Sequence, residues 1–426
     1  MEEAHGTTEA NRKDIEERPF DIEEQPGGTR CRDHDLLNYN PKCTPEDLKG
    51  EGYFAKVDIA GGTCILTDIV TLLVTVWHDD DRIQQILSNA FENQSGGLKQ
   101  YQAWVDNAEE RDKHGDKWQS YFEEYGMPIH SIRSARRDGP GYKETGLFRY
   151  MALFQHSCLA NAHFSYNPKT LMGSLHAIRD IPKGEKVTIS FLPELAYLDD
   201  NKRFSARLVL KKTFGRTCFC SLHTAPDAED YSATVKTMYS LLSPELHGYG
   251  SYADHLCLFY YIHQAYCKHD VFDVRRARVL EECMECAISY GDAARAIIFA
   301  NIAKDRYCVL EGPDGLKVVE MEKYMADVIQ HPKFNAHGRH SQSTSQIIRK
   351  TEGDQKEGIF DWVWMQGKWA RLSPYSAKYK KMAGLDGSIP GLTVVSIANS
   401  QQAQPSMSSY LDVLAYYVLK QTQVAA

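Results

Sequence analysis

Apolar and polar positions follow two different periods along this chain, and the change of period separates strand-rich from helical stretches. Residues 52–74 contain short apolar and β-branched runs with a Gly-Gly turn between them. Such runs bounded by turn residues are typical of short strands. Residues 144–190 return to this pattern, where Val187 and Ile189 alternate with polar residues after a Pro-Lys-Gly turn. The pattern predicts a β-rich domain built from short strands.

A helical period replaces the strand pattern in two places. Residues 79–135 carry apolar side chains three and four positions apart among charges, which predicts a helical insertion at about residues 75–143. The same period fills residues 225–335, where Asp292 is the predicted N-cap of one helix. The sequence therefore predicts an α+β chain. A β-rich domain at residues 29–217 holds the helical insertion, and an α-helical C-terminal domain follows.

The two ends of the chain and one internal stretch lack both periods. Residues 1–28 are acidic with few apolar side chains, so we expect a disordered leader there. Residues 336–358 are polar, which predicts a linker or mobile loop. Residues 359–426 are predicted to form a C-terminal extension with a last helix near residues 409–421.

Composition and charge exclude some classes of partner. The chain has 426 residues, 42% of them hydrophobic and 25% charged, which is ordinary for a globular protein. A net charge of -8 argues against a broad nucleic-acid surface, so no direct nucleic-acid binding is expected. The apolar run at residues 65–77 is interrupted by Asp68 and is short, since crossing a bilayer takes about 20 residues. We expect a buried strand or helix there and no membrane association.

The cysteines and the N-terminus bear on the cellular compartment. Eleven unevenly spaced cysteines do not suggest a disulfide framework, and no apolar stretch of a secretory signal follows the first residues. We expect a reduced intracellular setting, cytoplasmic, nuclear or both.

The residues that point to a particular chemistry lie in four segments in a fixed order. GEGYFA at 50–55 contains a Gly-x-Gly turn, which lets the backbone approach a ligand closely because no Cβ intervenes. QHSCLAN at 155–161 places a His beside a Cys, and IPKGEKVTISF at 181–191 leads from a turn into a strand. CFCSLH at 218–223 carries a Cys-x-Cys pair and a His. The glycine turn alone favours an ordinary hairpin, but together the segments resemble the SET domain, the fold that methylates lysines with S-adenosylmethionine.

This resemblance implies a cofactor site. In the SET family the Gly-x-Gly turn and the aromatic residue after it line the methionine end of the cofactor. The family's Asn-His-Ser-Cys-x-Pro-Asn segment is matched here except at Gln155 and Ala160, which indicates a divergent member. His156 alone would favour a structural core histidine, but within this motif we expect it and the glycine turn to share one pocket. The residues expected to contact the cofactor are Gly50, Gly52, Tyr53, Gln155, His156, Asn161, Phe191 and Phe219.

The cysteine pair near residue 220 resembles the family's post-SET zinc segment. Cys218, Cys220 and His223 match it with His in place of the last Cys. In the SMYD-like branch, which also carries a helical C-terminal region, the fourth ligand comes from the His-Ser-Cys motif, here Cys158. Three Cys and one His suit a tetrahedral structural zinc, with free buried thiols as the alternative. The pair Cys283 and Cys286 is predicted to be buried core. No Cys occurs in residues 74–143, so the MYND zinc finger usual to that branch is absent.

Phe191 stands where the SET family usually has a Tyr. The Tyr hydroxyl helps orient the amine that accepts the methyl group, and losing such a group typically costs on the order of 100 to 10,000-fold in rate. Tyr197, a few residues on, is a possible replacement. The expected catalytic residues are Phe191, Tyr197 and His156.

Three functions remain open from the sequence. The first is a methyltransferase whose acceptor is a small-molecule carboxylate, which is ionised at neutral pH and needs no base. The second is a protein-lysine N-methyltransferase, the default of the family. The third is a catalytically inactive SET-fold scaffold that binds a partner through its helical region.

Overall fold

The chain divides into two compact units. One is formed by residues 1–30 with 70–149, the other by residues 31–69 with 150–426. The computed structural model describes residues 36–40, 52–77, 126–129, 142–148, 150–151, 154–191, 252–268, 270–338 and 363–364. Strand β3 (Cys64–Trp77) runs through both units, so each half of it is described with its own unit.

In the first unit the described strands form an antiparallel ladder. The second half of β3 pairs with β5 (Tyr142–Phe148), and β4 (Met127–Ile129) pairs with the other edge of β5. Gly146 lies where these strands crowd together, since a Cβ there would be 2.6 Å from Ile129 Cδ1. Only a residue without a side chain fits at this point of β5.

The second unit contains short strands in small sheets. They are β1 (Leu37–Asn40), β2 (Gly52–Ala55), β6 (Gln155–His156), β7 (Ala162–Asn167), β8 (Met172–Ala177) and β9 (Thr188–Ile189). β1 pairs with β2, while the first half of β3 pairs with β8 and β8 with β7, all antiparallel. β6 and β9 form a two-residue parallel ladder. This ladder brings the histidine motif beside the strand that leads to Phe191.

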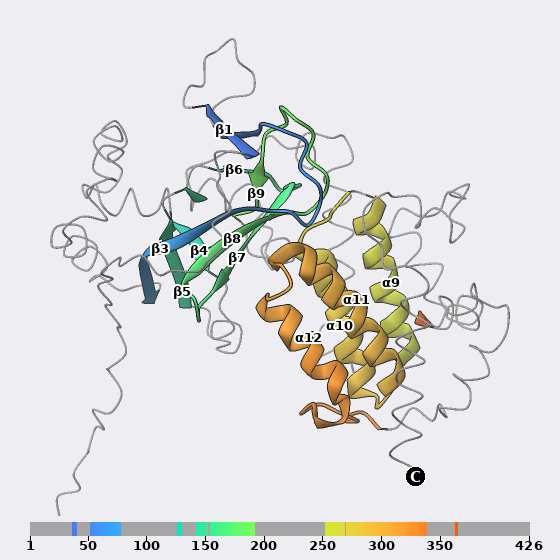
Figure 1. Cartoon of the computed structure of the whole chain (residues 1–426). Helices are drawn as coiled ribbons and strands as arrows, with labels where there is room; N and C mark the ends of the chain where they lie inside the picture. Colours follow the sequence, from blue (N-terminus) through green and yellow to red (C-terminus); the bar gives the residue numbers. More distant parts are fainter. Residues whose placement is uncertain are drawn as a thin grey trace, which may run out of the picture. The chain divides into compact units, whose positions relative to one another are not determined.

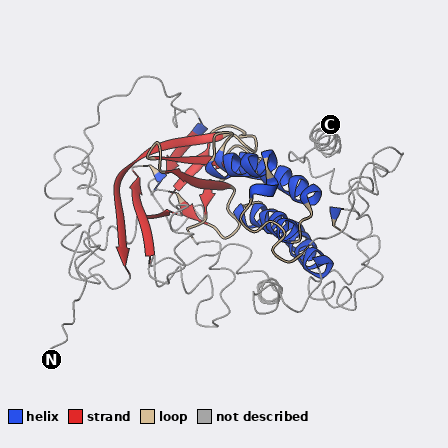
Figure 2. Cartoon of the chain, turned by 90° about the horizontal axis from the view of Figure 1, so that it is seen from below, coloured by secondary structure: helices blue, strands red, loops and turns tan. Residues whose placement is uncertain are grey.

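The described part of the second unit also contains four α-helices. They are α9 (Tyr252–Lys268), α10 (Val274–Ser289), α11 (Ala293–Glu311) and α12 (Leu316–Ala326), followed by the 3-10 helix η3 (Val328–Gln330). α11 packs between α10 and α12 and also contacts β7 and β8 (Figure 1). Figure 2 shows the helices as one group beside the strands. The predicted α+β class, short strands followed by a helical region, is confirmed.

Two of the helices begin with a buried aspartate that caps the first turn. Asp273 accepts a hydrogen bond from the Arg275 backbone N–H at 3.0 Å, and Asp292 accepts from the Arg295 backbone N–H at 3.1 Å. The predicted cap at Asp292 is therefore confirmed. Each aspartate also forms an ion pair with the side chain of the arginine that it caps. Both helix starts thus combine a cap with a buried charge pair.

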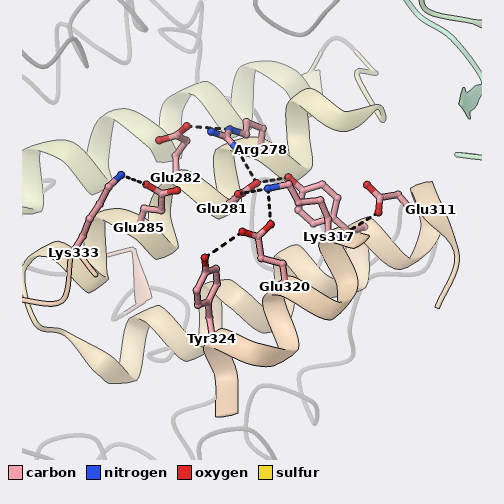
Figure 3. Close-up of polar contacts among 10 residues, drawn as sticks. Arg278, Glu281, Glu282, Glu285, Glu311, Lys317, Glu320, Tyr324 and Lys333 are labelled. Atoms are coloured by element: carbon pink, nitrogen blue, oxygen red, sulfur yellow. Dashed lines mark hydrogen bonds and ion pairs between the residues drawn. The ribbon is translucent and has the colours of Figure 1, made fainter. Parts of the chain in front are cut away.

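A polar network joins α10, α11 and α12 around Glu281 (Figure 3). The Glu281 carboxylate is 4% exposed and accepts hydrogen bonds from Tyr307 Oη at 2.5 Å and Lys317 Nζ at 2.8 Å. Arg278 Nη1 lies 3.0 Å from the same carboxylate. Burial alone would raise the pKa of Glu281, but the charges of Arg278 and Lys317 and the hydrogen bonds outweigh it and lower that pKa.

Several local predictions can be compared with the described residues. The apolar run at residues 65–77 forms a strand. Its Asp68 is buried, and the carboxylate accepts hydrogen bonds from Tyr150 N at 2.6 Å and Met151 N at 3.3 Å, which offset the cost of burying it. Cys283 is fully buried, which confirms its core assignment, whereas Cys286 is only partly buried and packs against the helical core. Among the described residues, no helix is long and apolar enough to cross a membrane.

The predicted insertion at residues 75–143 differs at its edges. β3 continues to Trp77, and β4 and the start of β5 also fall inside this range, because they pair with one another and with β3. The helical patterns between them lie outside the described residues. The acidic leader at 1–28, the polar linker after residue 338 and the helix at 409–421 also lie outside them, and these stay predictions.

Candidate functional site

The first feature of the site is the close approach of β2 to β6 at Gly52. Gly52 has a φ of +137°, a backbone conformation that L side chains rarely adopt. A Cβ there would also lie 3.1 Å from Gln155 Cγ, closer than ordinary van der Waals contact. The backbone conformation and the nearby Gln155 side chain both favour glycine at this position. The structure therefore brings the glycine turn and the histidine motif together, as the sequence predicts.

Tyr53 continues this contact along β2. Its ring centroid lies 4.6 Å from that of Phe154, with the rings tilted by 36°. Its carbonyl accepts a hydrogen bond from Val187 N at 2.8 Å, and two residues further along β2 Ala55 N donates to Glu185 O at 2.9 Å. β2 is thus held on one edge by β1 and on the other by the segment that leads into β9.

His156 links β6 to the residue beyond β9. Its Nδ1 accepts a hydrogen bond from the Phe191 backbone N–H at 3.0 Å, and its Nε2 lies 3.2 Å from Cys158 Sγ. A ring nitrogen that accepts carries no proton, so the neutral imidazole holds its proton on Nε2, facing the sulfur. In this arrangement His156 fixes the position of the Phe191 main chain.

Phe191 is buried beside that histidine. Its side chain is 4% exposed, and its ring stacks on His156 with centroids 5.8 Å apart and an angle of 24° between planes. A phenyl ring has neither a donor nor an acceptor, so the Phe191 side chain cannot form a conventional hydrogen bond. Its predicted substitute, Tyr197, lies outside the described residues.

Asn161 closes the motif through its side-chain amide. The Nδ2 group donates to Glu185 Oε1 and to Lys186 O, both at 2.9 Å, and Oδ1 accepts from Thr188 N at 2.8 Å. The residue is 1% exposed. These bonds use both N–H groups of the amide, so Asn161 fixes the end of the motif against the strand entering β9. Its predicted contact with the cofactor stays a prediction.

The Arg179–Glu185 pair supports this framework and was not singled out by the motifs. Arg179 Nη1 donates to Glu185 Oε2 at 3.1 Å, while Nη2 pairs with Oε1. Burial alone would raise the pKa of Glu185, but the hydrogen bonds from Arg179 and Asn161 and the Arg179 charge outweigh it and lower that pKa. The only signal in the sequence is the presence of opposite charges on either side of the Pro-Lys-Gly turn.

The predicted zinc ligands fall mostly beyond the described residues. Cys158 is buried, with its sulfur near His156 Nε2. Within the described ranges, no group of three or more His, Cys, Asp or Glu side chains is arranged to hold a metal ion. The other predicted zinc ligands, Cys218, Cys220 and His223, lie outside the described residues, so the zinc site stays a prediction. Two predicted cofactor contacts, Gly50 and Phe219, also lie outside them.

Comparisons with known proteins agree with this fold. Residues 50–192 match the family model of the SET domain. Histone-lysine N-methyltransferase set5 of Schizosaccharomyces pombe is 23% identical over 300 residues, which cover 68% of this chain and 85% of that protein. Together these matches support a SET-domain methyltransferase. Neither comparison bears on the SMYD-like branch or the post-SET cluster, which stay predictions.

One solved structure also resembles part of the chain. It is a Plasmodium falciparum protein named for histone methyltransferase activity, 16% identical, covering 37% of this chain and 93% of that one. The TM-score is 0.19, too low to carry an argument.

Proposed function

We propose that this chain transfers a methyl group from S-adenosylmethionine to a lysine side chain of a protein. The observation that carries the proposal is the close approach of Gly52 to Gln155, because these residues belong to the two segments that the SET family uses around the cofactor. The Schizosaccharomyces pombe relative is named as a histone-lysine N-methyltransferase, which supports a protein acceptor.

The residues present fit a sulfonium cofactor. At Gly52 no Cβ covers the backbone, so a ligand can approach it closely. The faces of aromatic rings such as those of Tyr53 and Phe191 attract cations. Gly52, Tyr53, Gln155 and His156 would hold the cofactor. When bound, it supplies an electrophilic methyl group.

The chain's own residues then supply alignment and exclusion of water. Buried Phe191 removes water from its surroundings, and His156 fixes the main chain that carries it. A lysine must reach the site as the neutral amine, and a reference pKa of about 10.4 makes this cost roughly 4–5 kcal/mol at pH 7. Because Phe191 cannot hydrogen-bond to the amine, we assign that role to Tyr197.

The test uses the full chain, methyl-labelled S-adenosylmethionine and a cell extract. We expect label in protein that survives acid hydrolysis as methyl-lysine. Tyr197→Phe should lower the rate by roughly 100-fold or more. Tyr324→Phe, a tyrosine on α12, is the matched control and should leave the rate within about twofold.

Two outcomes separate the parts of this proposal. If the chain binds the cofactor but labels no protein, the protein acceptor is wrong. If it neither binds the cofactor nor transfers label, the methyltransferase assignment is wrong and the inactive scaffold is the better description.

A small-molecule carboxylate is a second candidate acceptor. The observation that favours it is the absence of a hydroxyl on buried Phe191 beside His156. A carboxylate with a pKa of about 4 is ionised at neutral pH and needs no proton removal. The labelled reaction with a pool of small acids would then release label under mild base, as expected of a methyl ester. No base-labile label in that pool excludes this acceptor.

A further inference from the structure

The helical region reaches the histidine motif through one buried arginine. Arg275, in the first turn of α10, donates from Nη2 to the main-chain carbonyl of Cys158 at 2.6 Å. The same guanidinium binds Asp273 through Nε at 2.8 Å and through Nη2 at 2.6 Å. Arg275 is 4% exposed. One planar group therefore joins the cap of α10 to a backbone atom two residues after His156.

The loop that receives this bond is held at three points. At its start, Ser157 N donates to Ile189 O at 2.9 Å, and at its end the amide of Asn161 is fixed against the strand entering β9. Between these points Leu159 packs against the helical core, and Cys158 O meets Arg275. The strands thus fix both ends of residues 157–161, and the helices fix the middle.

The chemistry of this contact requires an arginine. A buried carbonyl bonded to a charged donor forms a stronger hydrogen bond than one bonded to a neutral donor. A lysine offers one point charge and no rigid fork, so it cannot reproduce the planar geometry that Arg275 uses with both partners. Losing the fork frees the Cys158 carbonyl while the cap at Asp273 can persist.

We propose that Arg275 is a positioning residue of the cofactor site, through which helix α10 sets the conformation of the His156–Asn161 segment. The inference rests on the proposed function, because it takes that segment to contact S-adenosylmethionine. It gives the helical region a part in cofactor binding, although its residues lie more than a hundred positions away in the sequence.

A second arginine of the same fold provides the matched control. Arg295 is 1% exposed, pairs with the capping Asp292 at the start of α11, and donates to Val363 O at 3.2 Å. It repeats the cap, the ion pair and the main-chain bond, but its carbonyl partner is not in the histidine motif. Arg295→Lys should therefore cost stability as Arg275→Lys does without changing cofactor affinity.

The first measurement is calorimetric binding of S-adenosylhomocysteine and steady-state kinetics on the full-length variants. Arg275→Lys should weaken binding and raise the KM for S-adenosylmethionine roughly three- to thirtyfold, with kcat changed less. Arg295→Lys should stay within about twofold of wild type in both. Equal affinities for folded Arg275→Lys and wild type would overturn the inference.

The second measurement needs no cofactor. Hydrogen exchange of a peptide covering residues 155–161 should be faster in Arg275→Lys than in wild type and unchanged in Arg295→Lys. If Arg275→Lys does not fold, Asp273→Asn replaces it, because Asn keeps a capping side chain and removes the charge that holds Arg275. The same direction of change is expected for Asp273→Asn, and unchanged exchange in it overturns the inference.

The two proposals fail in different ways. Wild type that does not bind S-adenosylhomocysteine overturns the proposed function, whatever the exchange result. If wild type binds and folded Arg275→Lys equals it in affinity or in exchange, only the role of Arg275 is overturned.

Discussion

At the scale of single residues, the conformation of Gly52 carries most of the argument. Its φ of +137° and the 3.1 Å separation of a built Cβ from Gln155 Cγ make it a position where the backbone itself forms the surface. Positive φ is strained for any other residue, typically by about 1–3 kcal/mol. Three other motif residues hold the neighbouring segments in place by hydrogen bonds. His156 accepts from Phe191 N, the Tyr53 carbonyl accepts from Val187 N, and the Asn161 amide bonds to three main- and side-chain partners.

Replacing this glycine should separate backbone strain from loss of the site. We expect Gly52→Ala to destabilise the fold by about 1–3 kcal/mol and to weaken S-adenosylmethionine binding at least tenfold, because the Cβ meets Gln155. Gly62→Ala is the control, since Gly62 also has a positive φ, +85°, but nothing lies within 4 Å of its built Cβ. Urea denaturation and calorimetry measure the two effects. Equal binding by both variants would show that the contact at Gly52 is not part of the site.

A buried carboxylate in the helices predicts a different effect, on stability alone. Glu281→Gln should lower the free energy of unfolding by about 1–3 kcal/mol, because Arg278 and Lys317 lose a charged partner in a buried place (Figure 3). Glu285→Gln, whose partner Lys333 is 63% exposed, should cost less than about 1 kcal/mol. A cost for Glu285→Gln as large as that for Glu281→Gln would contradict this ranking in urea denaturation.

At the scale of secondary-structure elements, the joint between α11 and α12 depends on one carboxylate. Glu311, the last residue of α11, accepts a hydrogen bond at 3.1 Å from the backbone N–H of Lys317 in the first turn of α12. Burial raises the pKa of Glu311 to about 7, helped by the charges of Glu281 and Glu320 and opposed by the bond and charge of Lys317. The ordinary value is 4.5.

This shift predicts the pH dependence of stability. Between pH 4.5 and about 7 the unfolded chain has released the Glu311 proton while the folded chain keeps it, so stability falls as the pH rises through this window. The total effect is at most about 3 kcal/mol, and it is constant below and above the window. Glu311→Gln should remove this pH dependence. The unfolding free energy of the variant minus that of wild type should therefore increase between pH 5 and 7. Glu322→Gln, an exposed carboxylate of α12, should follow wild type, and a parallel pH profile for Glu311→Gln would contradict the assignment.

The elements also show how far sequence patterns reach. The strands at 52–55 and 64–77 and the cap at Asp292 follow from local alternation and capping rules, because neighbours in sequence decide them. β4 was not predicted as a strand because three residues carry too little pattern, and its state is decided by pairing with β5. The bond from Arg275 to Cys158 links residues 117 positions apart, and no local rule identifies it.

At the scale of the whole molecule, the resemblance to the SET family predicted more of the tertiary arrangement than hydrophobic periodicity did. Hydrophobic patterns predict an α+β chain but not which segments meet, whereas the family motifs predicted that the glycine turn would lie beside the histidine segment, as observed at Gly52 and Gln155. Phe191 was singled out from the sequence, and the structure shows that it is buried and that its backbone N–H donates to His156. The structure adds that α11 packs on β7 and β8 and that Arg275 of α10 donates to the Cys158 carbonyl in the histidine motif.

The most direct test of the central claim, that β2 and β6 together form a site for a methyl-donating sulfonium, is titration of the full chain with S-adenosylmethionine in a calorimeter. The account predicts saturable binding of one molecule per chain and a melting temperature that rises with cofactor concentration. No heat and no change in melting temperature at millimolar cofactor would contradict it.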